Sequence, residues 1–270
     1  MRLATGHPAT RALLLAGVLS ALGALALLPT LILHWQVNQS DSTTDDTPPI
    51  WPLPEDETEA RKAQLINTLL PAIQATNRDL LALREQAVAV HERFQAGKPD
   101  RGDLDWLHEQ ATRYRLESPD SLEALTDDWF ATLLRRIDII PASLALAQGA
   151  IESAWGTSRF AQEGNNYFGQ WCFSPGCGMV PARRPAGAKY EVERFASVEE
   201  AVRRYMLNLN SHPRYRYMRV LREQARAQEK PLSGRVMAAG LNGYAEIGEV
   251  YISHIRSVIR HNDFDRFADF

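Results

Sequence analysis

Residues 141–156 read PASLALAQGAIESAWG and have the start, the end and the apolar stripe of a helix. A proline at the start is typical of the first turn of a helix, and a glycine at the end is typical of helix termination. Leu144, Ala147 and Ile151 recur at spacings of three and four residues, and Ala154 continues the same apolar stripe. The pattern therefore predicts a core helix over the whole stretch.

One carboxylate lies at the edge of this stripe. Glu152 follows Gln148 by one turn and precedes Trp155 by three residues, so the three side chains share a neighbouring face of the helix. A carboxyl group against apolar surface has its charged form disfavoured, which raises its pKa toward the range of a general acid. Glu152 is therefore a candidate catalytic residue, and the alternative is an ordinary solvated helix glutamate.

The chain before this helix is also predicted to be helical. Apolar residues recur at helical spacing in three segments, of which the first is either one helix or two that meet at Pro71. Ser121 is placed to cap the last of them. None carries a chemical constellation, so residues 61–120 are interpreted as a helical support region. The predicted helices are 58–95, 104–116 and 122–137.

The N-terminal part of the chain differs in composition. Residues 12–33 contain no charged side chain, and only Arg2 and Arg11 carry charge before them. Such a length suffices to cross a hydrocarbon core of about 30 Å, and the preceding arginines favour a cytoplasmic N-terminus. We predict a membrane anchor or uncleaved signal over 1–35, with a cleavable signal peptide as the alternative. The acidic, proline-rich segment 36–60 is predicted to be a disordered tether.

The net charge of −3 is unevenly distributed along the chain. Residues 41–59 hold seven acidic side chains and no basic one, whereas 140–270 hold 17 basic and 13 acidic side chains. The mild positive excess suits an anionic partner or an ordinary solvated surface. No basic stripe interleaved with aromatic residues is present, which disfavours nucleic acid as a partner. Two cysteines are too few for a disulfide-dense scaffold or a four-cysteine zinc cluster.

Four short motifs follow in order from the end of the predicted core helix. Together they resemble the glucosaminidase group of peptidoglycan hydrolases, glycoside hydrolase family 73, over roughly residues 125–270. Within this group, the segment WCFSPGCG at 171–178 resembles the Bax proteins of Gram-negative bacteria. The four motifs are ESAWGTS at 152–158, NNYFG at 165–169, HPRY at 212–215 and NGYA at 242–245.

The resemblance implies a mainly α-helical, lysozyme-like domain (α+β class) over 121–270, with a small β-hairpin lobe. It further implies an endo-β-N-acetylglucosaminidase that cleaves the β-1,4 bond after N-acetylglucosamine in peptidoglycan glycan strands. No cofactor and no metal are expected for this chemistry. With the predicted anchor in the inner membrane, the catalytic domain is expected in the periplasm.

The resemblance also assigns candidate roles to single residues. Glu152 matches the general acid of the family, and Tyr244 matches a tyrosine near the reaction centre. The alternative for Tyr244 is a core aromatic residue beside a glycine turn, and the two asparagines of NNYFG could simply hold a turn. The substrate-binding candidates are Gln148, Trp155, Asn165, Asn166 and Phe168.

A second carboxylate is expected in the hairpin lobe, between residues 170 and 195. The candidates are Glu191 and Glu193, which point to the same face if this segment is a strand. Either could activate a water molecule, and we take Glu191 as the catalytic candidate. The alternative is a solvated face of an edge strand.

Cys172 and Cys177 flank the sequence Phe-Ser-Pro-Gly, which favours a turn. In an oxidising compartment, a disulfide between them would close the tip of the hairpin. Without a nearby histidine, two thiols at this spacing make a poor metal site.

Two other functions stay open. Lytic transglycosylases, which act at the N-acetylmuramic acid linkage, also use one catalytic glutamate. However, the Gly-Leu-Met-Gln-like segment that commonly follows their Glu-Ser element is absent here. A non-catalytic peptidoglycan-binding scaffold would use the same groove only to hold glycan.

Overall fold

The computed structural model describes residues 54–244 and 248–267. The predicted anchor, and the predicted tether up to residue 53, lie outside these ranges. Within them, no helix combines the length and the apolar composition that crossing a membrane requires. The chain divides into the units Met1–Pro49 and Ile50–Phe270, and every element below belongs to the second.

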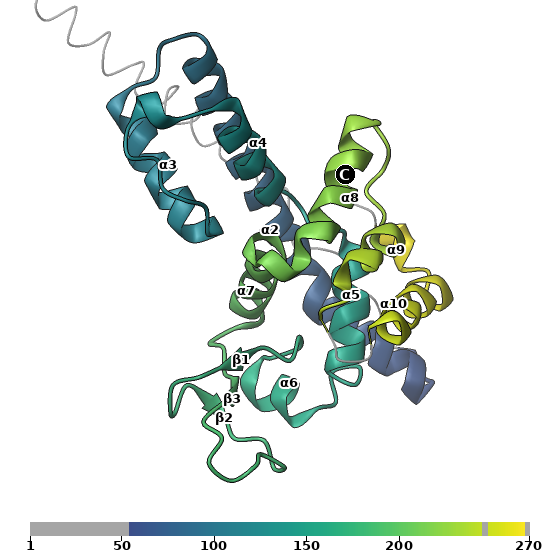
Figure 1. Ribbon diagram of the computed structural model, residues 1–270. Coiled ribbons are helices and arrows are strands. Elements are labelled where there is room, and N and C mark those ends of the chain that lie inside the picture. The colour runs from purple at the N-terminus through teal and green to yellow at the C-terminus, as the bar shows by residue number, and fades with distance from the viewer. Residues whose placement is uncertain (1–53, 245–247, 268–270) are drawn as a thin grey trace, which may run out of the picture. The chain divides into compact units, whose positions relative to one another are not determined.

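The described part is mainly helical, as predicted, and a long helix, α2 (Glu57–Gln95), opens it (Figure 1). Short 3-10 helices lie at 122–124, 213–215, 238–241 and 264–267. The remaining helices are α3 (Arg101–Tyr114), α4 (Asp127–Arg136), α5 (Ala142–Glu152), α6 (Arg159–Gly164), α7 (Val198–Ser211), α8 (Arg216–Ala227), α9 (Gly234–Met237) and α10 (Glu249–His261).

Helix α2 begins inside the predicted tether and continues through Pro71. The carboxylate of Asp56 accepts a hydrogen bond from the amide of Glu59 at 2.9 Å, which caps the first turn. The last residues of the acidic segment are therefore helical. Leu69 and Ile73, on either side of the proline, are fully buried. Their burial offsets the hydrogen bond that a proline removes from a helix interior, so one helix forms and not two.

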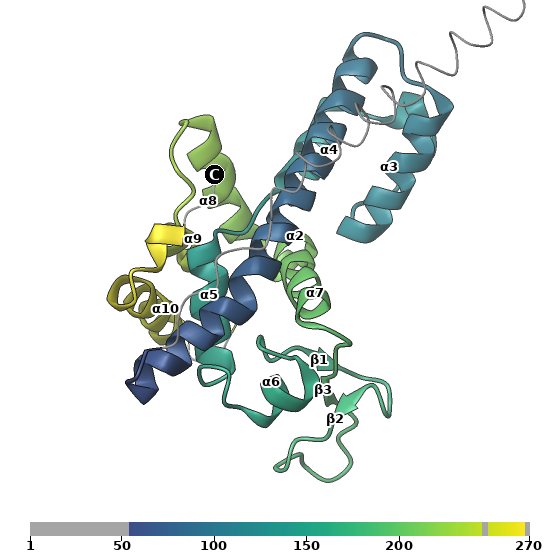
Figure 2. The same ribbon diagram turned by 180° about the vertical axis from the view of Figure 1, so that it is seen from behind.

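Two apolar clusters share α2. Its first half packs with α5, α7 and α10 in the larger cluster, and both views show α2 running beside α5 (Figure 2). Its second half contributes Ala87 and Val90 to a smaller cluster with α3 and α4. The aromatic side chains of Tyr114 and Phe130 are fully buried there. One continuous helix therefore links the predicted support region to the domain that carries Glu152.

Several helix boundaries differ from the predictions: the helix predicted over 104–116 spans Arg101–Tyr114, and two further differences change the interpretation of single residues. The helix predicted from residue 122 begins at Asp127, because Thr126, and not Ser121, accepts the capping hydrogen bond, from the amide of Trp129 at 3.2 Å. Helix α5 ends at Glu152, short of the predicted end at residue 156. Ala154 therefore lies beyond the helix and is exposed, so its place in the apolar stripe was wrong.

A small antiparallel sheet forms the predicted β lobe. Its strands are β1 (Trp171–Cys172), β2 (Gly178–Met179) and β3 (Glu191–Glu193), in the order β1-β3-β2. Val192 in the central strand pairs with both neighbours and is buried.

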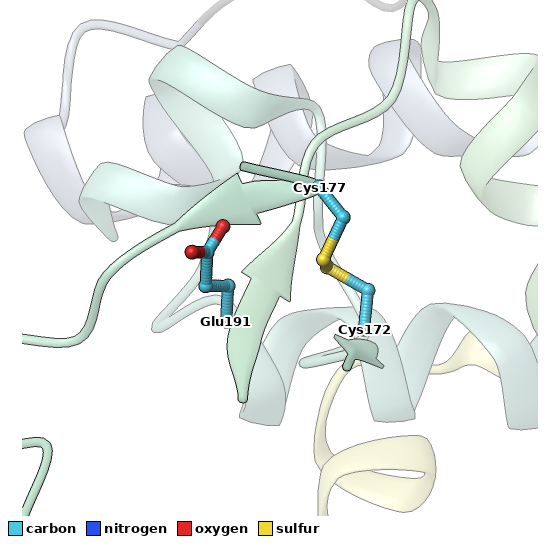
Figure 3. A group of neighbouring side chains, drawn as sticks. All are labelled: Cys172, Cys177 and Glu191. Carbon is cyan, nitrogen blue, oxygen red and sulfur yellow. A yellow bond between two sulfur atoms is a disulfide. The ribbon is translucent and has the colours of Figure 1, made fainter. Parts of the chain in front are cut away.

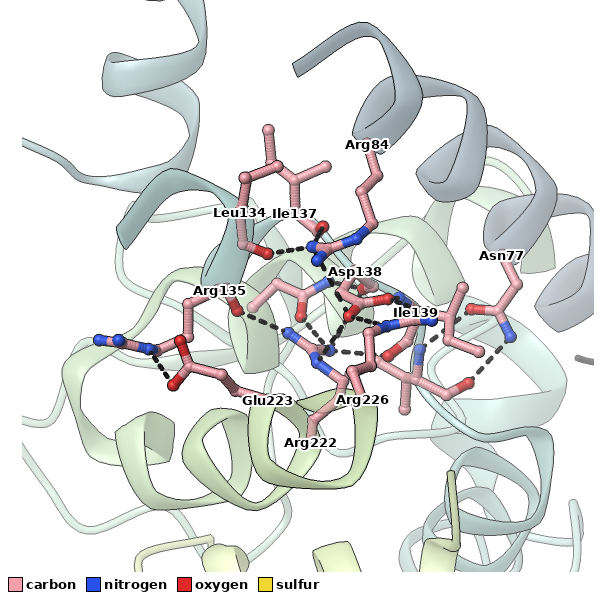
Figure 4. Close-up of polar contacts among 12 residues, drawn as sticks. Asn77, Arg84, Leu134, Arg135, Ile137, Asp138, Ile139, Arg222, Glu223 and Arg226 are labelled. Atoms are coloured by element: carbon pink, nitrogen blue, oxygen red, sulfur yellow. Dashed lines mark hydrogen bonds and ion pairs between the residues drawn. The ribbon is translucent and has the colours of Figure 1, made fainter. Parts of the chain in front are cut away.

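The segment between α4 and α5 is held by a buried charge cluster around Asp138 (Figure 4). Its carboxylate accepts two hydrogen bonds from Arg226, each of 2.6 Å. The fully buried Arg222 donates to the carbonyl oxygen of Ile139 at 2.7 Å, and Arg84 of α2 lies 3.7 Å from the same carboxylate. Helices α2 and α8 therefore fix the chain that leads into α5.

Candidate active site

The chain turns sharply after Glu152, the last residue of α5. The amide of Trp155 donates to the carbonyl oxygen of Ala150 at 2.8 Å, and the amide of Ala154 donates to that of Ile151 at 3.4 Å. This is the Schellman pattern, usually formed with glycine at the left-handed position. Here Ala154 and Trp155 have φ angles of 51° and 59°. Each left-handed non-glycine residue costs about 1–2 kcal/mol, so the turn is strained where α5 ends at the carboxylate.

A chain of three hydrogen bonds ends on the Glu152 carboxylate. The hydroxyl of Tyr205 donates to Oε1 of Gln148 at 2.7 Å, and Nε2 of Gln148 donates to the hydroxyl oxygen of Tyr251 at 3.0 Å. The hydroxyl of Tyr251 in turn donates to Oε1 of Glu152 at 2.7 Å. Because an amide nitrogen can only donate, the tyrosine proton must point toward Glu152. This series of hydrogen bonds therefore fixes the Glu152 carboxyl group through Oε1 and leaves Oε2 to interact with a bound molecule.

The environment of Glu152 favours its protonated form. Burial raises the pKa of Glu152 above its usual value, and the hydrogen bond from Tyr251 opposes this effect. Gly169, with φ of 63°, lies beside Oε2, where an added Cβ would come within 3.3 Å of that oxygen. The glycine therefore keeps space free next to the carboxyl group, as a proton donor to a bound molecule requires.

Glu152 lines a groove with a volume of about 1000 Å³. The β lobe forms one part of its wall, and residues of α7 and the segment that follows it form another. Trp171, in β1, and Phe173, in the loop that follows β1, line the groove and are 48% and 76% exposed. Exposed aromatic side chains in a groove commonly mark a binding surface. The groove thus combines a carboxyl group, aromatic side chains and ample space.

Tyr244, the predicted second aromatic residue of the centre, also lines this groove. Its hydroxyl donates to the carbonyl oxygen of Phe168 at 2.8 Å. Its ring stacks in parallel on that of Tyr251, with ring centroids 5.5 Å apart. The structure therefore brings Tyr244 beside the hydrogen-bond partner of Glu152, with its phenol oxygen still able to accept one hydrogen bond.

The two candidate second carboxylates occupy different places. Glu193 lines the groove, and Arg204 lies 4.0 Å from its carboxylate. Glu191 is buried and is not among the residues that line the groove. Its carboxylate accepts hydrogen bonds from the amides of Gly176 at 3.1 Å and Gly178 at 2.9 Å, and these two bonds lower its pKa. Glu193, and not the chosen Glu191, therefore lines the same groove as Glu152, because the carboxylate of Glu191 is held by the backbone amides of Gly176 and Gly178.

The predicted disulfide between Cys172 and Cys177 is confirmed (Figure 3). It closes the loop that joins β1 and β2, the two outer strands, which are not paired with each other, so this loop is not the tip of a hairpin as predicted. The carboxylate of Glu191, on the central strand, accepts a hydrogen bond from the amide of Gly176 in the same loop. Cys172 and its neighbours Trp171 and Phe173 line the groove. The disulfide therefore supports the aromatic wall of the groove.

The two asparagines of the NNYFG segment hold a turn. Asn166, fully buried, donates to the carbonyl oxygens of Gln170 at 2.9 Å and Glu193 at 2.8 Å. Asn165 has a φ of 52° and donates to the carbonyl oxygen of Phe195 at 3.0 Å. Neither lines the groove, so the geometry matches the turn alternative and not direct substrate binding.

The other substrate-binding candidates divide between the groove and the core. Phe168 lines the groove and stacks on Tyr205 with ring centroids 4.0 Å apart. Gln148 lies behind Glu152 in the hydrogen-bond chain and is fully buried. Trp155 is not among the lining residues, and its ring lies 6.3 Å from that of Phe264. Of the five candidates, the structure brings only Phe168 to the groove.

Tyr251 is the residue that sequence reasoning missed. In the sequence it looks like the first apolar residue of the last helix, 99 positions after Glu152. No local pattern joins two residues so far apart in the chain. The contact between Tyr251 and Glu152 becomes visible only in the folded structure, where α10 packs against α5.

Comparisons with known proteins show the family to which the chain belongs. The model of the glucosaminidase family, described as mannosyl-glycoprotein endo-beta-N-acetylglucosaminidase, matches residues 128–264, and the chain belongs to this family. The chain is also 31% identical over 202 residues to Protein bax of Escherichia coli (strain K12), a match that covers 75% of this chain and 70% of that protein. No solved structure matches. The resemblance inferred from the four motifs, to the family and to Bax proteins, is confirmed.

Proposed function

We propose that this protein is a peptidoglycan hydrolase that cleaves the β-1,4 bond after N-acetylglucosamine, with Glu152 as the general acid. Membership of the glucosaminidase family supports a glycosidase activity of this kind. One observation carries the assignment of the acid. Glu152 is the carboxyl group whose pKa is raised by burial at the groove, while Tyr251 holds one of its oxygens.

In the proposed reaction, the proton of Glu152 moves to the glycosidic oxygen as the bond from this oxygen to the anomeric carbon breaks. The anomeric carbon then carries the positive charge of an oxocarbenium-like transition state. Tyr251 keeps donating to Oε1, so it stabilises the carboxylate that the proton transfer leaves behind. Burial raises the pKa of Glu152, so more of the enzyme holds the proton that this step requires.

Two further residues support the same step in this proposal. Glu193 is the carboxylate placed to take a proton from the attacking water, whose oxygen bonds to the anomeric carbon. Tyr244 has its own proton engaged by the carbonyl oxygen of Phe168, so its phenol oxygen can accept the amide proton of an N-acetyl group. Trp171 offers an exposed ring on which a sugar can stack.

We further propose that residues 1–35 anchor the protein in the inner membrane and that the catalytic domain faces the periplasm. The uncharged stretch after Arg11 supports the anchor. The disulfide between Cys172 and Cys177 supports an oxidising compartment.

The products of digestion test the proposed function. Purified sacculi are incubated with the protein, and the released muropeptides are identified by mass spectrometry. The hydrolase is expected to release fragments with reducing N-acetylglucosamine ends. Ends made of 1,6-anhydromuramic acid would instead identify a lytic transglycosylase, and binding to sacculi without release would identify a scaffold.

Tyr251→Phe is expected to shift the alkaline limb of the pH–activity profile to higher pH. Glu152 acts while protonated, so activity falls as pH rises through its pKa. Tyr251 donates to the charged carboxylate and thereby lowers this pKa, so its removal raises the pKa. The profile of kcat/KM against pH measures the shift. An unmoved limb would contradict the role of Tyr251, and Tyr217→Phe, at an exposed site on α8, is the matched control.

A further inference from the structure

The helices that precede the family domain reach the groove. Arg113 and Arg115, at the end of α3, line the same groove as Glu152, although both lie before residue 128, where the family match begins. Between them, Tyr114 is fully buried in the smaller apolar cluster. Nη1 of Arg136 donates to the carbonyl oxygens of Tyr114 and Arg115, at 2.5 and 2.7 Å. The end of α3 is therefore held firmly in place at the groove.

These two arginines belong to a positively charged part of the groove. Arg204 and Arg214 line it from α7 and from the segment after it. Among the residues that the structure describes, no carboxylate forms an ion pair with Arg113, Arg115 or Arg214, and Arg204 reaches only Glu193, at 4.0 Å. Several guanidinium groups at one groove without carboxylate partners are suited to an anionic ligand.

His212, the histidine of the HPRY motif, lies close to arginines from both sides of the groove, and their positive charges act on it together. Burial lowers the pKa of His212, and the nearby charges of Arg115, Arg214 and Arg219 lower it further. Arg115 comes from the α3 side and Arg214 from the side of the family domain. The acidic residues of the lining are Glu152 and Glu193, to which the proposed function assigns the chemistry.

We propose that Arg113 and Arg115 form a subsite for the carboxylates of the peptide stems on the glycan, so that the α3 region selects stem-bearing strands. This inference rests on the proposed function. In a stem-bearing strand the sugars offer hydroxyl and amide groups, because the lactyl carboxyl group of each muramic acid is bound to its stem as an amide, whereas the stems themselves offer carboxylates. The planar fork of arginine matches a carboxylate with two parallel hydrogen bonds. The helical support region would therefore determine specificity and not only support the fold.

The test compares glycan strands that carry their stems with the same strands after an amidase has removed the stems and the lactyl carboxyl groups that it frees have been converted to amides. The readout is the ratio of kcat/KM on the stem-bearing strand to that on the stem-free strand. The double variant Arg113→Gln/Arg115→Gln is expected to lower this ratio about tenfold. Added salt is expected to lower the wild-type ratio as well, because it screens exposed charges. Arg101→Gln, at the exposed start of α3 and away from the groove, is the matched control.

A second readout does not depend on cleavage. In the inactive Glu152→Gln background, co-sedimentation with both kinds of strand is expected to show weaker binding to the stem-bearing strand when the two arginines are replaced. An unchanged ratio and unchanged binding in a normally folded double variant would overturn the subsite. If the wild type cleaves neither strand, the proposed function fails, and the binding comparison still decides the subsite. Arg113→Lys/Arg115→Lys, which keeps the charges, is expected to restore part of the preference.

Discussion

Glu152→Gln is expected to lower the release of fragments from peptidoglycan by about 10²–10⁴-fold, the usual contribution of a general acid. Glutamine has the same shape, and its carbonyl oxygen can still accept the hydrogen bond from Tyr251. It has no proton of suitable acidity to give to the glycosidic oxygen. Chromatography of fragments released from sacculi over time measures the loss.

Two measurements make this result specific. The melting temperature of the Glu152→Gln variant is expected to stay close to that of the wild type, because its hydrogen bonds and packing are retained. Glu163→Gln, at an exposed position on α6 outside the groove lining, is expected to keep full activity. Undiminished activity of the Glu152→Gln variant would contradict the assignment of Glu152 as the general acid.

Asp138→Ala is expected to cause the largest loss of stability, about 3–5 kcal/mol, as when one partner is removed from a buried ion pair. Its carboxylate is the shared partner of Arg84, Arg222 and Arg226 (Figure 4). Without it, the guanidinium of Arg222 stays fully buried with no opposite charge beside it. Thermal unfolding followed by circular dichroism is expected to show a melting temperature lower by about 10 °C.

The pH dependence gives an independent check on Asp138. Burial acts to raise the pKa of Asp138, but the hydrogen bond from Arg226 and the charges of Arg222 and Arg84 outweigh it, so the pKa lies below its usual value. Its stabilising effect is therefore present above about pH 4, the unfolded value, and is lost as the pH falls through the lower folded value. The difference in the free energy of unfolding between the wild type and Asp138→Ala is therefore expected to become smaller at acidic pH. Glu223→Gln, which breaks a partly exposed pair with Arg135, is expected to cost under about 1 kcal/mol.

The parts of the site that were predictable depend on neighbours in the chain. A turn-forming sequence of four residues between Cys172 and Cys177 keeps the two thiols close, so the disulfide was predictable. Apolar spacing placed Glu152 at the end of a core helix, and the structure confirms this helix over Ala142–Glu152. Its early end was not predictable, because the left-handed turn at Ala154 occurs without the glycine that usually marks it.

The parts that were not predictable depend on long-range packing. Glu191 and Glu193 are two residues apart in one strand, and both are glutamates. The sequence therefore does not indicate which of them accepts hydrogen bonds from the backbone amides of Gly176 and Gly178. The asparagines of the NNYFG segment fit a sugar or a turn equally well in chemical terms. Their hydrogen bonds to the carbonyl oxygens of Gln170 and Phe195, which the structure shows, match the turn.

The helical class, the core helix, the disulfide and the carboxyl group at the helix end were all predictable from the sequence, because each follows from spacing along the chain. The family, too, was recognisable from short motifs in order. Only the tertiary structure decided that Tyr251 holds Glu152, that Glu193 lines the groove, and that Arg113 comes to the same groove from α3. These three follow from helix and strand packing between distant segments, and such packing leaves no local pattern in the chain.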